Sequence, residues 1–123
     1  IDHILHVPHP EIADYYKRHD GIIFASSCEN MPNILLESMG SGKPIACSDK
    51  SPMDEFLIDG GFYFNAKSAN SIFETLERML KTLKTFEGLS LQNSEELKKY
   101  TWKKTAVKTI TFIENTIKTH KNA

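Results

Sequence analysis

Residues 22–48 read IIFASSCENMPNILLESMGSGKPIACS, which predicts a strand, a loop, a helix and a second strand in direct succession. The apolar residues 22–25 run into a small polar loop. Pro32 suits the first position of the helix, because it has no amide hydrogen to leave unpaired. Gly42 ends the helix, and the apolar residues 44–47 follow at once. Strands that are apolar on both faces and joined through a helix are typical of a buried parallel sheet.

The flanking segments extend this sheet to about four strands. Residues 4–7 form a short apolar run that Pro8 ends, and residues 62–64 form another after the turn signal DGG at residues 59–61. Alternating strands and helices predict the α/β class, with a partial doubly wound, Rossmann-like parallel sheet and right-handed crossovers.

The chain is expected to be one piece of a larger domain. Four strands are few for a doubly wound sheet, so residues 1–123 are interpreted as a single fragment of a nucleotide-binding domain. A start at Ile1 rather than Met agrees with a chain that has been cut. Within the fragment we expect an α/β part at residues 1–88 and an all-helical end at residues 89–123.

The expected helices carry apolar stripes at helical spacing. The first begins at residues 9–11 and packs one face on the sheet. A longer helix is capped by Ser68 or Asn70 and ends at Gly88, and a final helix follows Trp102. The stripes consist of Ile12, Tyr15, Tyr16 and His19 in the first helix, of Ile72, Leu76, Met79, Leu80 and Leu83 in the longer one, and of Ala106, Ile110, Ile113 and Ile117 in the last.

Composition excludes several classes of protein. With 40% hydrophobic and 25% charged residues, the chain is typical of a globular domain. The formal net charge of −1 offers no general attraction to phosphate backbones, so no nucleic-acid partner is expected. The two cysteines, Cys28 and Cys47, fit a reducing cytosol better than a disulfide framework, which predicts a cytoplasmic protein.

No metal site is expected. The sequence has no C-x-x-C pair. His3, His6 and His9 would fall on alternating faces of a strand, and Pro8 prevents a helix from gathering them.

The chemistry of the quoted stretch lies in its loop and helix start. Ligands of open α/β sheets bind beyond the carboxyl ends of the strands, where residues 26–31 are expected. A helix start attracts phosphate through unpaired amides, here expected from Asn33, Ile34 and Leu35. Glu29 and Glu37 would repel phosphate and therefore suit neutral hydroxyl groups. A sugar nucleotide has hydroxyls on both sides of a diphosphate and would fit this arrangement. The alternative is that acids near a helix start bind no ligand and only interact favourably with the helix dipole.

The same residues carry a family resemblance. The segment ASSCENMPNILLESMGSGKPIACSD contains a Glu-x(7)-Glu signature with an M-P-N insert and a following G-K-P-I strand. Upstream lies EIADYYKRHDGIIFASS, and downstream lie Glu55 with DGG and then Tyr100-Thr101-Trp102. In these features residues 4–64, and more loosely 100–113, resemble the C-terminal part of family 4 retaining glycosyltransferases (glycosyl transferases group 1), which have the GT-B fold.

The resemblance implies the donor-binding part of an enzyme that moves a sugar from a UDP-sugar, or another nucleotide diphosphate sugar, to a glycan or lipid-linked acceptor. It implies that Glu29 is the catalytic-site acid that holds hydroxyls of the transferred sugar, and that Glu37 accepts the ribose hydroxyls. Transfer in this family retains configuration and needs no metal or other cofactor. The implied donor sugar and diphosphate residues are Ser27, Cys28, Glu29, Asn30, Met31, Pro32, Asn33, Ile34 and Leu35.

Departures from the family pattern limit this reading. The family's Arg and Lys pair lies on early strands, and its acceptor domain precedes them; neither is found here. Ala25 replaces a usual Pro, and Asn30 replaces a usual Gly. We therefore expect the fragment alone to be inactive. The alternatives are a non-catalytic nucleotide- or phosphate-binding module of the same fold, or a GT-B epimerase or phosphorylase relative.

The lysine-rich C-terminal segment has two interpretations. It carries Lys98, Lys99, Lys103, Lys104, Lys108, Lys118 and Lys121, opposed by few acids after Glu96. Such a segment is commonly a solvated helix face, and the alternative is peripheral contact with the cytoplasmic face of a membrane. The apolar stripe of the final helix is a separate feature, and we expect it to face the part of the enzyme that precedes this chain.

Overall fold

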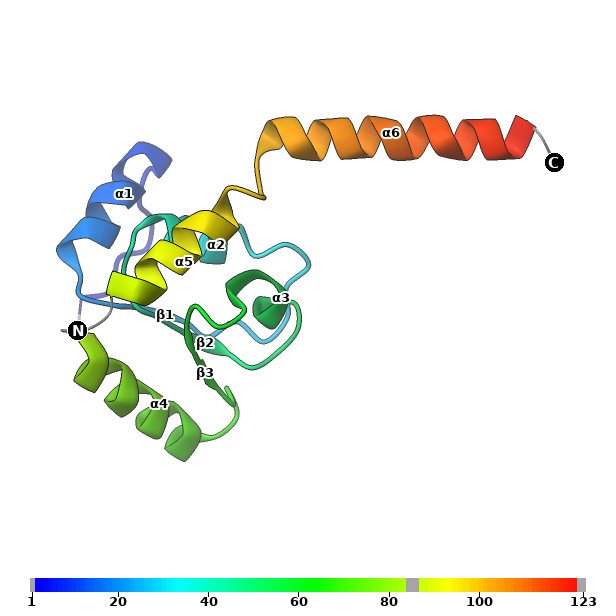
Figure 1. The fold of residues 1–123 in the computed structure, drawn as a ribbon. Helices are drawn as coiled ribbons and strands as arrows, with labels where there is room; N and C mark the ends of the chain where they lie inside the picture. Colours follow the sequence, from blue (N-terminus) through cyan, green and yellow to red (C-terminus); the bar gives the residue numbers. More distant parts are fainter. Residues whose placement is uncertain (1, 84–86, 122–123) are drawn as a thin grey trace.

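A parallel sheet in the order β1-β2-β3 forms the centre of the fold (Figure 1). The computed structural model describes residues 2–83 and 87–121. The strands are β1 (Ile22–Phe24), β2 (Ile45–Ser48) and β3 (Phe62–Phe64). Every residue of the central strand β2 is buried, whereas Ile23 of the edge strand β1 is 53% exposed. The expectation of strands buried on both faces therefore holds for β2 and is wrong for β1.

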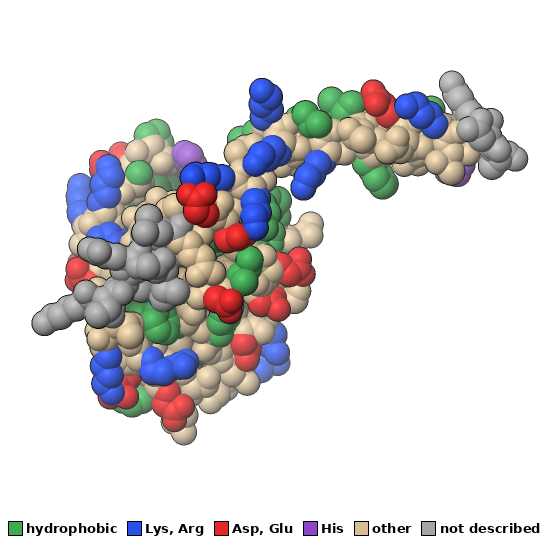
Figure 2. All heavy atoms as spheres, viewed as in Figure 1, with side chains coloured by type: hydrophobic (Ala, Val, Ile, Leu, Met, Phe, Trp, Pro, Cys, Tyr) green, Lys and Arg blue, Asp and Glu red, His purple; other side chains and the backbone are tan. Residues whose placement is uncertain are grey.

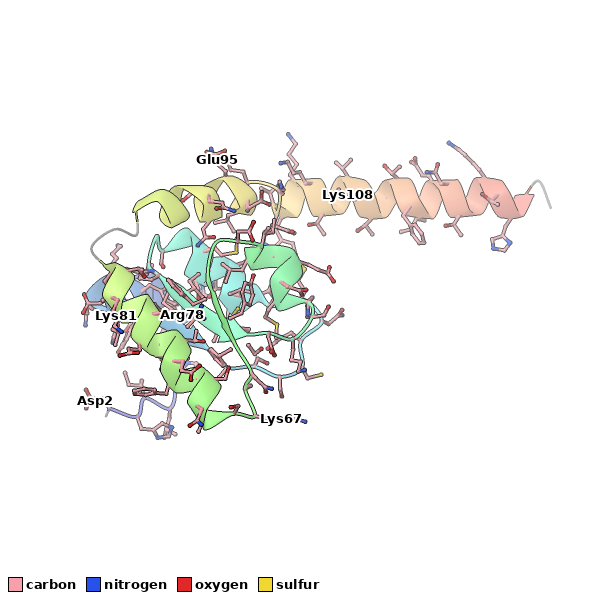
Figure 3. All side chains as sticks on the ribbon, turned by 60° about the horizontal axis from the view of Figure 1, so that its bottom comes forward. Asp2, Lys67, Arg78, Lys81, Glu95 and Lys108 are labelled. Atoms are coloured by element: carbon pink, nitrogen blue, oxygen red, sulfur yellow. The ribbon has the colours of Figure 1, made fainter. Side chains whose placement is uncertain are left out.

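The described residues form six helices. They are α1 (His9–Arg18), α2 (Asn33–Gly40), α3 (Met53–Leu57), α4 (Ala69–Thr82), α5 (Glu87–Leu97) and α6 (Trp102–Lys121). Helices α2, α3 and α5 pack together on one side of the sheet, and α4 packs on β2 and β3 from the other (Figure 1). Figure 3 shows the same separation, with Arg78 and Lys81 on α4 and Glu95 on α5.

Each face of the sheet has its own core. On the α2 and α3 side, the buried cluster consists of Phe24, Leu35, Met39, Ile45, Cys47, Met53 and Leu57. On the α4 side, Met79 packs with Ala46 and Phe64. Because burial of one such large apolar side chain contributes about 1.5–3 kcal/mol, these two clusters are the main attraction that holds the strands and helices together.

Local signals explain several element ends. The side chain of Ser68 caps α4 by accepting a hydrogen bond from the Ser71 amide, which confirms the expected cap. Gly42 follows α2 with a φ of 70°, a conformation that glycine adopts without the clash of a Cβ atom. Of the apolar stripe of α4, Leu80 is 61% exposed. Thr75 is buried there instead, and its hydroxyl donates to the Tyr63 carbonyl.

Two expectations about element boundaries are wrong. Residues 4–7 form no strand, and Ile4 and Leu5 are 50% and 89% exposed. A strand needs a neighbour for its backbone groups, and this segment pairs with none in the described chain. The sheet thus has three described strands rather than four. Gly88 does not end α4, which stops at Thr82; it lies inside α5, which begins at Glu87.

The final helix stands clear of the body. Every described residue of α6 through position 120 is exposed, including its apolar stripe (Figures 1 and 2). Ile110, Ile113 and Ile117 are each at least half exposed. The stripe predicted from the sequence is present, and its residues are exposed.

Candidate functional site

The loop from β1 to α2, residues 25–32, lies at the carboxyl edge of the sheet, where the strand order predicts a ligand site. Its first part is tied to the next strand, because the Ser48 hydroxyl at the end of β2 donates to the backbone carbonyl of Ser26. The Ser26 hydroxyl in turn donates to the carbonyl of Cys28 at 3.5 Å. The base of the loop is therefore fixed to two strands.

The predicted donor residues divide by exposure. Ser27, Cys28, Asn30, Met31, Asn33 and Ile34 are exposed, and Glu29 is half-buried. The side chains of Pro32 and Leu35 are buried, and Leu35 belongs to the core below α2. These two residues can therefore offer a ligand only backbone groups.

The start of α2 differs from the sequence interpretation in one respect. Pro32 precedes the helix as its cap residue, and Asn33 is the first helical residue. The Asn33 amide already donates to the Met31 carbonyl at 2.9 Å, so the prediction that this amide is free is wrong. The Leu36 amide makes the first helical bond, to Pro32 at 3.1 Å. The amides of Ile34 and Leu35 are left without a backbone acceptor among the described residues.

The two acids occupy different surroundings. Glu29 lies in the loop before α2. Glu37 lies in the second turn of α2, and its side chain is 38% exposed. Oε1 of Glu37 lies 3.6 Å from Nε2 of His9, the first residue of α1. Glu37 is therefore accessible at the surface and faces a group that can carry a positive charge.

A groove of about 460 Å³ opens beside Glu37. One face of α1 forms one wall, and Glu37 and Gly40 of α2 form another. Trp102, at the start of α6, lines it as well and is 87% exposed. The remaining lining residues, all on α1, are His9, Ile12, Ala13 and Tyr16.

This groove corrects the prediction for the first helix. No residue of α1 is buried, and its apolar face lines the groove instead of packing fully on the sheet. The spacing of Ile12 and Tyr16 was the available signal, but periodicity alone does not tell a packed face from a groove wall. No motif pointed to His9 or Trp102 as neighbours of Glu37.

Glu55 lies within α3, and the DGG turn at residues 59–61 follows this helix. Ser51 donates to Oε1 of Glu55 at 3.2 Å. The turn is held from α5, because Nδ2 of the buried Asn93 donates to the Gly60 carbonyl at 2.9 Å. The Tyr63 hydroxyl donates to the Ile58 carbonyl at 2.6 Å, and burial raises the pKa of this phenol.

The two thiols are chemically distinct. Burial, reinforced by the nearby carboxylates of Asp54 and Asp49, raises the pKa of Cys47 to about 12. Cys28 is exposed in the donor loop. Because the thiolate is the reactive form, Cys47 is an inert core residue at neutral pH.

Two features are absent from the described residues, a cluster of metal-binding side chains and a membrane-spanning helix. No group of three His, Cys, Asp or Glu side chains in residues 2–83 and 87–121 is placed to hold a metal ion. None of the helices in that part of the chain is long and apolar enough to cross a membrane.

Comparison with known proteins gives a family and a fold. The sequence profile described as "Glycosyl transferases group 1" matches residues 1–114. A search of curated protein sequences finds no match. Among solved structures, sucrose-phosphate synthase from Thermosynechococcus elongatus is similar, with a TM-score of 0.79 at 18% sequence identity. The alignment covers 92% of this chain and 29% of that protein, so the chain spans less than a third of this structural relative.

Proposed function

Because the chain belongs to the glycosyl transferases group 1 family, we propose that it is the donor-binding part of a retaining glycosyltransferase. The donor is a nucleotide diphosphate sugar, of which a UDP-sugar is the first choice, and the acceptor is a glycan or a lipid-linked sugar. The observation that carries the proposal is the position of Glu29 and Glu37 on either side of the α2 start, at the carboxyl edge of a parallel sheet.

The start of α2 suits the diphosphate. The amides of Ile34 and Leu35 have no backbone acceptor in the described chain, and the positive end of the helix dipole adds to their attraction for an anion. In this proposal the loop residues before it, Ser27 to Met31, of which all but Glu29 are exposed, contact the sugar and the distal phosphate. No metal is required in this proposal, because amides and cations stabilise the leaving diphosphate.

The two acids take different parts of the donor. Glu29 is half-buried at the loop and accepts hydroxyls of the sugar that is transferred. Glu37 lies farther along α2 and accepts the ribose hydroxyls. This order follows the donor itself, in which the diphosphate separates sugar from ribose.

The site requires residues that this chain does not contain. A basic pair and an acceptor-binding domain are proposed to come from the remainder of a longer protein, which agrees with the 29% of the structural relative that the alignment covers. On its own, the chain is expected to bind donor weakly and to lack transferase activity. A non-catalytic nucleotide-binding module of the same fold would show the same binding and no activity even in the longer protein.

The exposed helix α6 supports a proposal about location. Its apolar stripe is exposed, and so are Lys103, Lys104, Lys108 and Lys118 (Figure 2). We propose that the stripe contacts the acceptor-binding part of a cytoplasmic enzyme, and that the lysines favour the anionic cytoplasmic face of a membrane. Binding of the chain to vesicles with and without anionic lipid tests the second part.

The donor site can be tested by NMR titration of the chain with UDP and with UDP-glucose. We expect amide shifts concentrated between Cys28 and Glu37. Glu37→Gln should weaken both ligands about equally, because both contain ribose. Glu29→Gln should weaken UDP-glucose and leave UDP unchanged, because only the sugar nucleotide carries the transferred sugar.

Glu74→Gln on α4 serves as the matched control, since Glu74 is exposed on the other side of the sheet. Amide shifts confined to α4 and α6, or equal effects of Glu29→Gln and Glu74→Gln, would contradict the proposed site.

A further inference from the structure

The single tryptophan of the chain, Trp102, lines the groove beside Glu37. It is 87% exposed, although tryptophan is highly buried on average in folded proteins. Its ring therefore contributes little to the core of this chain. An exposed aromatic ring at a groove is available to a ligand, to which it offers a large and rigid apolar face.

The backbone on either side of Trp102 is held to the body of the chain. Before it, the ring of Tyr100 packs on Phe56 of α3, with 4.9 Å between the ring centroids. After it, Nζ of Lys104 donates to the Lys98 carbonyl at 2.6 Å. The rest of α6 runs clear of the body (Figure 1). Trp102 is thus an exposed ring on a tethered backbone, and a ligand need not order the segment that carries it.

The groove combines apolar walls with a carboxylate. Ile12, Ala13 and Tyr16 of α1 line it, Trp102 lines it from α6, and Glu37 is its acid. Sites for small molecules are typically of about 300–1,000 Å³, mostly apolar or aromatic, with a few polar groups. This groove, at about 460 Å³, has that size and that composition. A flat heterocycle with apolar faces suits it.

The proposed donor brings such a heterocycle to this place. Glu37 is proposed to accept the ribose hydroxyls, and the nucleobase is joined to the same sugar ring. A base attached to this ribose must therefore lie close to Glu37. The groove supplies aromatic surface there from two helices, through Tyr16 of α1 and Trp102 of α6.

We propose that Trp102 stacks on the nucleobase of the donor and holds it in the groove against α1. This inference rests on the ribose-binding role proposed for Glu37. Stacking on an aromatic ring adds affinity for any base, because every base has a π-face. Trp102 is thereby a specificity-determining residue, which favours nucleotide donors over sugar phosphates that carry no base.

The test uses the indole of Trp102 as its probe, since the chain has one tryptophan and hence one indole N–H signal in an NMR spectrum. The chain is titrated with UDP and with ribose 5-phosphate, which has a ribose and a phosphate but no base. UDP is expected to shift the indole signal together with amides between Cys28 and Glu37. Ribose 5-phosphate should bind more weakly, shift amides near Glu37 and leave the indole signal unchanged.

Variants of the ring test its share of the affinity. Trp102→Ala should weaken UDP binding about three- to tenfold, at the lower end for base stacking because Trp102 is exposed. Ribose 5-phosphate binding should not change. Trp102→Phe keeps an aromatic ring and should retain most of the affinity for UDP. Because Trp102 lies outside the core, Trp102→Ala should unfold at the same denaturant concentration as the parent chain, which excludes misfolding as the cause.

Phe112→Ala is the matched control, because Phe112 is another exposed aromatic residue of α6 and does not line the groove. It should bind UDP as the parent chain does. If UDP shifts the amides between Cys28 and Glu37 but neither the indole signal nor the affinity of Trp102→Ala changes, Trp102 does not stack on the base, and the donor site still stands. An equal indole shift with ribose 5-phosphate would also reject stacking. Absence of UDP shifts throughout residues 28–37 would overturn the proposed donor site and the role of Trp102 together.

Discussion

The hydroxyl of Ser48 donates a hydrogen bond to the backbone carbonyl of Ser26, although the two residues are 22 positions apart. Ser48 is fully buried at the end of the central strand, and Ser26 is the second residue of the loop that leads to α2. The bond therefore couples the loop that contains Glu29 to the middle of the sheet.

Removal of this hydroxyl should affect both stability and binding. Ser48→Ala leaves the Ser26 carbonyl without its donor, which is expected to lower the free energy of unfolding by about 1–2 kcal/mol. Because the loop loses its anchor, UDP-glucose affinity should fall as well. Ser41→Ala is the control: its hydroxyl bonds to the Ser38 carbonyl at the other end of α2, so only stability should change. Denaturant titration and ligand titration of both variants distinguish the two effects.

The DGG turn should not tolerate a side chain at Gly60. A Cβ atom there would lie 1.7 Å from Oδ1 of Asn93 and 2.9 Å from the carbonyl oxygen of Leu57. Gly60→Ala is expected to destabilise the chain by about 2 kcal/mol or more, as overpacked cores do. Asn93→Ala removes the nearer obstacle. The double variant should therefore be less destabilised than the sum of the single variants, and strict additivity in denaturant titration would contradict this contact.

The two cysteines should react at very different rates. Cys28 is exposed, whereas Cys47 is buried with its pKa raised to about 12. At neutral pH we expect one thiol per chain to react rapidly with an alkylating reagent, and the second to react only after unfolding. Mass spectrometry of the modified peptides identifies the site. Rapid labelling of Cys47 in the native chain would show that β2 is not the closed central strand described above.

Cys47 should also make the fold sensitive to alkaline pH. Its pKa in the folded chain is about 12, compared with an ordinary value of 9.0. Below about pH 9 both states keep the proton, so the stabilisation is complete. Between about pH 9 and 12 the unfolded state loses the proton first, and stability falls by up to about 1.4 kcal/mol per pH unit. Chemical denaturation at several pH values measures this slope, and Cys47→Ala should reduce it. An unchanged slope in that variant would assign the effect to other groups.

Some features of the site were predictable because they are encoded within a few residues. Local chemistry predicts the loop and helix between β1 and β2, the cap at Ser68 and the turn at Gly42. The Glu-x(7)-Glu signature is likewise a matter of spacing along one loop and one helix. The sequence could thus predict that two acids flank a helix start, and it could predict the family.

Other features depend on segments that lie far apart in the chain. The sequence predicted neither the approach of His9 to Glu37 nor the groove that Trp102 lines. The strand expected at residues 4–7 and the buried face expected of α1 were wrong, because periodicity shows that a face is apolar and does not show what covers it.

The sequence by itself therefore determined the strand–loop–helix–strand unit and its two acids, since turns, caps and helical spacing act over a few residues. Only the tertiary structure decided how these acids are surrounded. It placed Glu37 beside His9, tied Ser26 to Ser48 and buried Leu35 below the helix start. The physical reason is that such contacts are set by the packing of helices and strands against one another, which depends on the whole chain and on no single stretch of it.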